Sequence, residues 1–180
     1  DRGKRDINPQ NLDNSCGKLH RIHDDGRIPS DNPFVGKAGA IESIFSYGHR
    51  NPQGVAMNPA TGEIWSNEHG PRGGDELNVH RKGLNYGWPV ISYGQNYDGS
   101  PIGDGIAVRE GMEQPVYFWD PVIAPGGMIF HSGDACGAWN GDALIGSLYP
   151  GGVVRLSIDG EGRVEAEERL LRDAGRVRDV

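Results

Sequence analysis

Two short patterns each occur twice in this chain, and they constrain its fold more strongly than any other feature. A glycine followed by three apolar residues precedes a turn and a strand-like segment at residues 54–57 and again at 127–130. An alternating segment runs into Asp25-Gly26, and a similar one runs into Asp159-Gly160. Repeated short strands with glycine punctuation are typical of propeller blades of roughly 40–50 residues. The repetition therefore predicts an all-β chain and favours a β-propeller over a β-sandwich.

Composition and charge agree with an all-β fold and exclude some functions. The 180 residues include 29 Gly and 12 Pro, and hydrophobic residues make up 36%, as in turn-rich β proteins. The length suffices for one domain with a sizeable core. No segment has the apolar length of a membrane helix, so we expect no membrane span. The net charge of −7 argues against a nucleic-acid-binding surface.

Local patterns predict where the strands lie. Asp25-Gly26 between alternating residues predicts a hairpin. Residues 41–47 are apolar enough for an inner strand, and 55–66 predict a strand, a turn and a second strand. Residues 67–76 are so rich in glycine and acid that we expect a loop held open for a ligand. Further strands are expected at 114–119, 124–130, 143–148 and 153–158.

The cysteines and the chain ends give weaker signals. Cys16 and Cys136 lack the pair spacing of a metal site, and two free thiols are favoured over one disulfide. The chain starts at Asp1 without a signal segment, and its last residues look like part of a strand. Both ends therefore look cut, and the start of the sequence says nothing about location.

The side chains that carry chemistry are concentrated between residues 46 and 89. Glu68, Asp75 and Glu76 are carboxylates, and nearby Gly-Pro and Gly-Gly steps allow backbone carbonyls to turn inward. Oxygen donors without cysteine suit a hard cation, above all Ca²⁺. Arg50 and Asn51 provide donors for a carboxylate or quinone oxygen. One region can thus supply a cation site and an anion site, although such a loop on its own is more often a plain turn.

Three longer motifs in this region resemble a known family. They are Gly-His-Arg-Asn-Pro-Gln-Gly at 48–54, Asn-Glu-His-Gly-Pro-Arg-Gly-Gly-Asp-Glu at 67–76, and Asn-Tyr-Gly-Trp-Pro at 85–89. In order and spacing they resemble the soluble aldose sugar dehydrogenases that depend on pyrroloquinoline quinone (PQQ), the glucose/sorbosone dehydrogenase family. The resemblance implies a six-bladed propeller, with residues 1–180 forming about half of it, in the middle-to-late blades of a longer single-domain protein. It also implies a periplasmic or extracellular location.

The resemblance assigns site residues by motif. The residues implied to contact PQQ are Arg50, Asn51, Tyr97, Arg176 and Arg178. The residues implied to bind calcium are Gly70 and Pro71, through their carbonyls, for the cofactor Ca²⁺, and Glu76 and Tyr86, the latter through its backbone oxygen, for a second Ca²⁺. Arginines two positions apart share one face of a strand. Taken singly, Arg176 and Arg178 would more often lie on an exposed strand face, and Tyr86 and Trp88 would be core aromatics.

Two departures from the family pattern concern charge and catalysis. Tyr149 stands where relatives place a lysine near the cofactor. The histidine that acts as general base in the family falls upstream of Asp1 by motif order, so no catalytic residue is expected within this chain. His49 and His69 belong to matched motifs at positions other than the base, and we do not assign them that role.

The implied activity is oxidation of the C1 hydroxyl of an aldose to a lactone, by hydride transfer to Ca²⁺-bound PQQ and then to an external electron acceptor. The alternative is a Ca²⁺-binding propeller that serves as a non-catalytic module for a glycan or a protein partner. A lactonase-like hydrolytic propeller is a weaker alternative, because Arg50, Arg176 and Arg178 fit an anionic cofactor better than a central metal site.

Overall fold

The structure is a computed structural model that describes residues 8–180. Within this range the chain is all-β, and its helical residues are confined to three short 3₁₀ turns, η1, η2 and η3. The strands are β1 (Lys18–His20), β2 (Ile44–Tyr47), β3 (Pro52–Met57), β4 (Ile64–Glu68), β5 (Asp75–His80), β6 (Tyr117–Trp119), β7 (Pro125–Phe130), β8 (Ala143–Ser147), β9 (Val153–Ile158) and β10 (Val164–Leu170).

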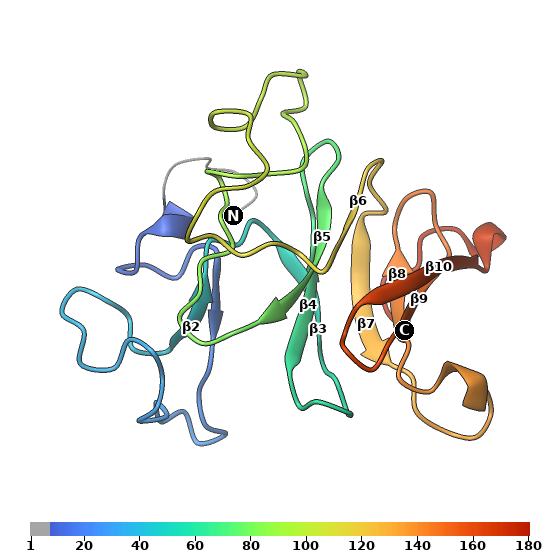
Figure 1. Cartoon of the computed structure of the whole chain (residues 1–180), viewed down its shortest axis with the longest axis horizontal. Helices are drawn as coiled ribbons and strands as arrows, with labels where there is room; N and C mark the ends of the chain where they lie inside the picture. Colours follow the sequence, from blue (N-terminus) through green and yellow to red (C-terminus); the bar gives the residue numbers. More distant parts are fainter. Residues whose placement is uncertain (1–7) are drawn as a thin grey trace.

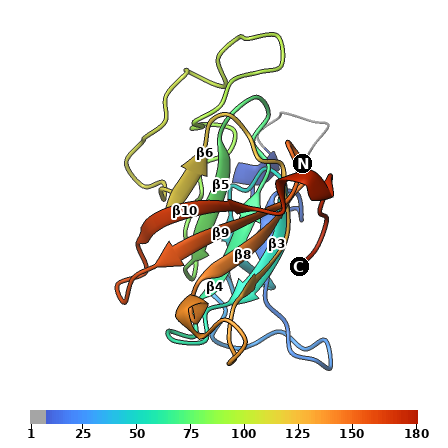
Figure 2. The same cartoon turned by 90° about the vertical axis from the view of Figure 1, so that its right-hand side faces the viewer.

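The strands form propeller blades, as the sequence repeats predicted. β3-β4-β5-β6 is one four-stranded antiparallel sheet in chain order, and β7-β8-β9-β10 is a second. β1 and β2 form a separate two-stranded sheet. The first strands of the two complete blades, β3 and β7, lie against each other, and the sheets stand side by side like spokes (Figure 1). Figure 2 shows the second blade, with β10 and β9 in front of β8.

The predicted hairpin at Asp25-Gly26 is wrong. A tight turn forms there, in which Gly26 N–H donates to His23 O at 3.0 Å, but no strand follows it. Instead β1 pairs with β2, with Lys18 opposite Tyr47. The turn is satisfied locally, because the Asp25 carboxylate accepts hydrogen bonds from the Arg27 N–H and side chain. Pro29, which lacks an N–H, cannot extend a ladder there.

The predicted loop at 67–76 is shorter than expected. β4 continues through Glu68 and β5 begins at Asp75, so the loop covers only residues 69–74. Asn67, Glu68 and Asp75 are all buried. Polar side chains remain in buried strands when each finds hydrogen-bonding partners, and the partners here come from distant parts of the chain.

The expected strand around Arg176 and Arg178 does not form, although the segment is extended alongside the second blade. Val177 N–H donates to Ser147 O at 3.1 Å, and Gly127 N–H donates to Arg178 O at 2.7 Å. The approach requires glycine, since a Cβ at Gly126 would lie 2.4 Å from Arg178 O. The segment therefore follows the inner strands without joining their ladder.

The hydrophobic core lies between the two complete blades. It is a cluster of Trp65, Leu77, Trp119, Ile123, Met128, Phe130, Ala143, Ile145, Val154 and Leu156. The Trp65 and Phe130 rings meet edge to face with centroids 5.4 Å apart, a favoured aromatic geometry. Above the core, the Glu167 carboxylate of β10 accepts hydrogen bonds from Tyr117 and Trp119 of β6 at 3.1 and 2.8 Å. Both apolar packing and these polar contacts join the blades.

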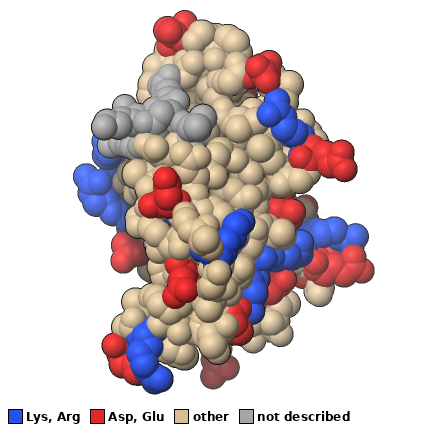
Figure 3. Space-filling view, turned by 90° about the vertical axis from the view of Figure 1, so that its left-hand side faces the viewer, with Lys and Arg blue, Asp and Glu red and all other residues tan. Residues whose placement is uncertain are grey.

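Both cysteines lie at the surface, and Cys16 and Cys136 are free thiols, as the sequence favoured. None of the described helical segments is long and apolar enough to cross a membrane. On the face shown in Figure 3, acidic and basic side chains are interspersed. One exposed cluster is Asp31 with Arg21 and Lys82, at 2.9 and 2.8 Å.

Replacing Leu77 with alanine tests the importance of the interblade core. Leu77 is fully buried, so the change should lower the free energy of unfolding by about 2–5 kcal/mol. Chemical denaturation of the protein at its natural full length measures this. The control is Met57→Ala, because Met57 is 62% exposed and its loss should cost less than about 0.5 kcal/mol. Equal losses in the two variants would contradict the assignment of the core.

Candidate functional site

The segment from Gly48 to Asn51 is held by the last residue of β4. The Glu68 carboxylate oxygen Oε2 accepts hydrogen bonds from the Arg50 and Asn51 N–H groups at 2.7 and 3.0 Å. His69 N–H donates to Asn51 O at 3.1 Å. Both peptide groups of Asn51 are thereby fixed, so the direction in which its Cα–Cβ bond leaves the main chain is fixed as well.

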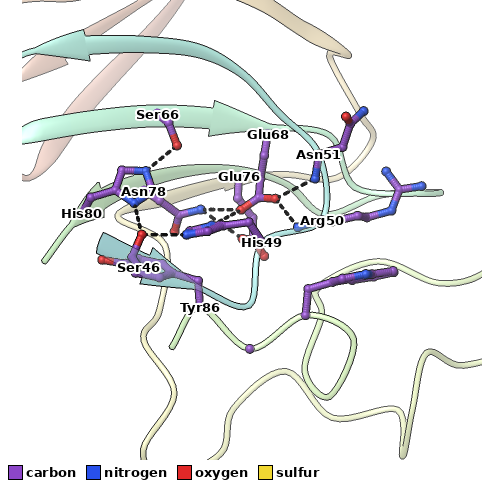
Figure 4. Close-up of polar contacts among 12 residues, drawn as sticks. Ser46, His49, Arg50, Asn51, Ser66, Glu68, Glu76, Asn78, His80 and Tyr86 are labelled. Atoms are coloured by element: carbon purple, nitrogen blue, oxygen red, sulfur yellow. Dashed lines mark hydrogen bonds and ion pairs between the residues drawn. The ribbon is translucent and has the colours of Figure 1, made fainter. Parts of the chain in front are cut away.

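A chain of buried hydrogen bonds runs from Glu68 into the first complete blade (Figure 4). His49 Nδ1 lies 3.2 Å from Glu68 Oε1, and His49 Nε2 lies 2.9 Å from Ser46 Oγ. Ser46 Oγ is 3.0 Å from His80 Nδ1, and His80 Nε2 is 2.6 Å from Ser66 Oγ. All five side chains are buried. Such a satisfied network favours one arrangement of the strands it joins.

Burial sets the protonation of this network. Burial lowers the pKa of His80 to about 3, and the neighbouring His49 acts in the same direction. Burial alone would raise the pKa of Glu68, but the His49 side chain and the Arg50 and Asn51 N–H groups hold it below its ordinary value. Glu68 is therefore a carboxylate and His80 a neutral imidazole at physiological pH.

Two carboxylates face each other across β4 and β5. Glu76 pairs with Glu68 in the strand register, and the Asn78 amide donates to both carboxylates at 3.2 and 3.1 Å. Burial, followed by the nearby charges of Glu68 and Asp75, raises the pKa of Glu76 to about 8. Because its pKa is about 8, Glu76 is mostly protonated at neutral pH, next to the ionised Glu68.

A small cavity adjoins these carboxylates. Its volume is about 10 Å³, and Glu76, Tyr86 and Trp88 are among the side chains that line it. A cavity of this size is close to the minimum for one water-sized species. The structure therefore brings Glu76 and Tyr86, both implied calcium ligands, to one small cavity.

Asp75 shapes the loop 69–74. Its carboxylate accepts N–H groups from Gly70 at 2.8 Å and, across the blade junction, from Ile123 at 2.8 Å and Ala124 at 2.7 Å. The loop is closed on itself, since a Cβ at Gly70 would lie 2.2 Å from Gly73 O. The sequence identified Asp75 only as a cation-binding candidate, whereas the structure uses it to hold backbone.

Arg50 lies behind this loop. Its guanidinium donates to His69 O at 2.7 Å and to Gly70 O at 2.9 Å, and it lies over the Trp88 ring at 5.2 Å. Arg50 is 5% exposed and lines the small cavity. The Gly70 carbonyl, an implied calcium ligand, is thus directed at Arg50 in this structure.

The other implied cofactor contacts meet in one groove of about 520 Å³. Its lining includes Asn51, Gly70, Pro71, Tyr97, Tyr149, Arg176 and Arg178. These residues come from separate segments of the chain, and Tyr97, Arg176 and Arg178 are exposed. The structure therefore brings together four of the five residues implied to contact PQQ, with Arg50 directly behind the groove.

The sequence did not identify the bracing roles of His49, Glu68 and His69. His69 lines the groove, and its Nε2 lies 2.7 Å from Pro125 O in the next blade. The available signal was the run Ser66-Asn67-Glu68, which is polar yet continues an apolar strand segment. Polar residues that continue a strand inward indicate a buried hydrogen-bonding network.

Comparison with known proteins settles the family. The family model for Glucose / Sorbosone dehydrogenase matches residues 1–180. The chain belongs to the glucose/sorbosone dehydrogenase family. Its resemblance to that family, inferred from three motifs, is confirmed.

The chain is 47% identical over 173 residues to aldose sugar dehydrogenase YliI of Escherichia coli, which covers 95% of this chain and 46% of that protein. The apo-form structure of the soluble E. coli aldose sugar dehydrogenase superposes with a TM-score of 0.92 at 45% identity, covering 99% of this chain and 51% of that one. The PQQ-bound form of the Streptomyces coelicolor aldose sugar dehydrogenase superposes with a TM-score of 0.77 at 27% identity, covering 99% and 46%. The chain thus spans about half the length of these family members, and the propeller fold is confirmed.

The buried network predicts a pH dependence of stability. The pKa of His80 is about 3 in the folded protein, below its ordinary value of 6.5. Folding therefore favours the neutral form of His80. The contribution of neutral His80 to the free energy of unfolding is fully present above pH 6.5 and is lost progressively as pH falls. Acidification from pH 7.5 to pH 5 should cost about 2 kcal/mol through His80.

Denaturation at several pH values tests this with His80→Gln, which should flatten the decline below pH 6.5. The matched control is His23→Gln, since His23 is exposed and its replacement should leave the decline unchanged. A decline of the same slope in the His80 variant would show that other groups cause it.

Proposed function

We propose that the protein at its natural full length oxidises the C1 hydroxyl of an aldose to a lactone, with Ca²⁺-bound PQQ as hydride acceptor and an external acceptor for the electrons. The observation that carries this proposal is the meeting of Asn51, Tyr97, Arg176 and Arg178 in one groove. Family membership supports a sugar-oxidising enzyme, and the PQQ-bound relative from S. coelicolor supports the choice of cofactor.

The groove has the chemistry that a planar anionic quinone requires. Arg176 and Arg178 supply two guanidinium groups, which bind carboxylates as fixed, charged donors. Asn51 adds an amide whose backbone is immobilised by Glu68, and Tyr97 adds an exposed ring and hydroxyl. The whole chain carries a net charge of −7, so the positive charge that would attract an anion comes from the arginine side chains of the groove and not from the chain as a whole.

We propose that Arg50 also contacts the cofactor. Its Nη1 donates to the His69 and Gly70 carbonyls, and a guanidinium carries five N–H donors in all. A turn of the guanidinium toward the groove would release the Gly70 carbonyl, which with that of Pro71 is the proposed donor set for the cofactor Ca²⁺. Both residues lie at the groove, so their position fits that role.

We propose a second Ca²⁺ at the small cavity, with Glu76 and the Tyr86 backbone oxygen among its ligands. The raised pKa of Glu76, caused by burial and then by Glu68, indicates a place where a divalent cation would offset unfavourable negative charge. Oxygen donors of this kind suit Ca²⁺. Within residues 8–180 no group of three or more His, Cys, Asp and Glu side chains has metal-binding geometry, and backbone oxygens complete the proposed sets.

In this proposal Ca²⁺ and PQQ, when bound, would supply Lewis acidity and the hydride acceptor. The residues of this chain would bind and orient the cofactor: Arg176 and Arg178 would hold carboxylates, and Asn51 would donate to a cofactor oxygen. The proton of the sugar hydroxyl goes to a histidine that we place upstream of Asp1. His49 is fully buried and cannot touch a sugar, while His69 is directed at Pro125 O.

We also propose that residues 1–180 form the middle-to-late blades of a longer single-domain protein, and that this protein acts in the periplasm or outside the cell.

The second candidate function is a non-catalytic Ca²⁺-binding module for a glycan or a protein partner. One observation favours it: Tyr149, at the position of the family's lysine, is exposed in the groove, so one positive charge expected near the cofactor is missing.

A dye-reduction assay distinguishes the two candidates. The full-length protein, stripped with a chelator and then supplied with PQQ and Ca²⁺, should reduce an artificial electron acceptor when an aldose is added. Omission of either PQQ or Ca²⁺ should abolish the signal. A protein that binds Ca²⁺ and PQQ but reduces no dye with a panel of aldoses would support the non-catalytic module instead.

Replacing Arg178 with alanine tests the anion groove directly. Loss of one charged hydrogen bond should weaken PQQ binding by about 1.5–3 kcal/mol, measured by titrating the apo-protein at full length. The control is Arg163→Ala, because Arg163 is exposed and pairs with Asp159 at 2.8 Å, away from the groove. Unchanged PQQ affinity in a folded Arg178 variant would remove Arg178 from the site.

A further inference from the structure

We propose that Glu68 is a positioning residue for the cofactor: its buried carboxylate holds the backbone of Arg50 and Asn51, and thereby keeps the Asn51 amide directed into the groove. The inference rests on the proposed function, because PQQ is the ligand that Asn51 would contact. Glu68 itself is 3% exposed and is not among the residues that line the groove. Its influence on the cofactor would therefore be transmitted through the residues whose N–H groups it binds, Arg50 and Asn51.

The geometry shows how one carboxylate controls this segment. Glu68 Oε2 accepts two consecutive N–H groups, those of Arg50 at 2.7 Å and Asn51 at 3.0 Å. Two donors from successive peptide groups that converge on one oxygen fix both peptide planes. Because Asn51 O also accepts from His69 N–H at 3.1 Å, the backbone of Asn51 is held on both sides.

The segment needs such a brace because it lies outside the β ladder. The β3–β4 pairing is irregular between Pro52 and Gly54, and proline provides no N–H of its own. On the other side, Gly48 turns the chain with a φ of +78°. The N–H groups of Arg50 and Asn51 therefore find their acceptor in a side chain, and a buried N–H without an acceptor is costly.

The carboxylate is in turn held in one orientation. Its second oxygen, Oε1, is 3.2 Å from His49 Nδ1 and accepts from the Asn78 amide at 3.1 Å. One set of protonation states satisfies the whole chain of contacts: Ser66 donates to His80, His80 to Ser46, Ser46 to His49 and His49 to Glu68. Every group around Glu68 is then a donor.

A site surrounded by donors requires a carboxylate rather than an amide. In a Glu68→Gln variant, the side chain keeps its size but must direct an NH₂ group at either the Arg50 and Asn51 N–H pair or the His49 and Asn78 pair. An NH₂ group cannot bond to the two main-chain N–H groups, and on the other side it needs the His49 ring to reverse its tautomer and the Asn78 amide to turn round. With little change in volume, the substitution should therefore weaken the hold on Arg50 and Asn51, either by losing one side of these contacts or by replacing a charged acceptor with a neutral one.

The test compares Glu68→Gln with Asp142→Asn in the protein at its natural full length. Asp142 is also a buried carboxylate, 4% exposed, and binds Arg155 Nε at 2.7 Å in the second blade. It does not line the groove. Apo-proteins are titrated with PQQ at saturating Ca²⁺, and binding is followed by quenching of tryptophan fluorescence. Thermal melting of each apo-protein is recorded alongside.

We expect the Kd for PQQ to rise about tenfold or more in Glu68→Gln, from the loss of charged hydrogen bonds, and to stay unchanged in Asp142→Asn. A Glu68→Gln affinity equal to that of the wild type overturns the positioning role. Equal loss of PQQ affinity in both variants also overturns it, because general destabilisation would then explain the effect. Absence of PQQ binding by the wild type overturns the proposed function, and this inference with it, so the two failures are distinguishable.

If Glu68→Gln does not fold, Asn78→Ala decides the question. This variant keeps the Glu68 carboxylate and removes one donor that orients it, together with the hydrogen bond that the same amide gives to Glu76. The Kd for PQQ should rise about threefold, the lower end of the contribution of one hydrogen bond. An unchanged Kd in folded Asn78→Ala would overturn the proposal.

Discussion

The close approach of β3 and β7 is the constraint on which the rest of this structure depends. A Cβ at Gly54 would lie 2.7 Å from Gly126 O, so the two inner strands can meet only where neither carries a side chain. Asn67, which is fully buried, accepts from Gly54 N–H at 3.0 Å and donates to Gly126 O at 3.0 Å. The Asn67 amide therefore hydrogen-bonds to one backbone group in each blade, Gly54 N–H and Gly126 O. It bridges the two strands at a point where their backbone groups do not bond to each other.

With the inner strands fixed, the neighbouring polar residues complete the junction. Asp75 reaches from β5 to the N–H groups of Ile123 and Ala124, and His69 reaches Pro125 O. The rim of the groove therefore rests on side chains that hydrogen-bond to the main chain of the next blade, whereas apolar packing lies deeper, around Trp65 and Phe130. Hydrogen bonds are directional, so this rim places backbone atoms more specifically than apolar contacts alone would.

The sequence predicted the parts of this fold that depend on local pattern. The repeated glycine-led strands became β3 and β7, and β8 and β9 lie where apolar segments indicated strands. The partner of β1 could not be predicted, because a local Asp-Gly signal says nothing about a strand more than twenty residues later. The end of β4 was missed for a related reason, and β5 and β10 were not predicted as strands. Whether Glu68 or Asp75 can be buried depends on N–H groups that other segments supply.

The residues of the candidate site also fall into two groups, those that local sequence indicated and those that it did not. Residue chemistry indicated an anion site near Arg50 and Asn51 and a cation site near Glu76. Each of these sites could be recognised because its donors or acceptors lie within a short stretch of sequence. Tyr97, Arg176 and Arg178 are separated from them by long stretches of sequence, and only the family resemblance suggested that they belong together. Their meeting in one groove is a tertiary property. It follows from the path of the last segment along Gly126 and Gly146, which no local pattern reveals.

Gly70 connects the two halves of the site. Its N–H donates to Asp75, its carbonyl accepts from Arg50, and it borders both the groove and the small cavity beside Glu76. Without a side chain it can turn within a loop where a Cβ would lie 2.2 Å from Gly73 O. A movement of the Arg50 guanidinium toward the groove would remove a donor from this carbonyl and place positive charge nearer an anion. In the proposed function, the anion and cation sites would thus share one peptide group.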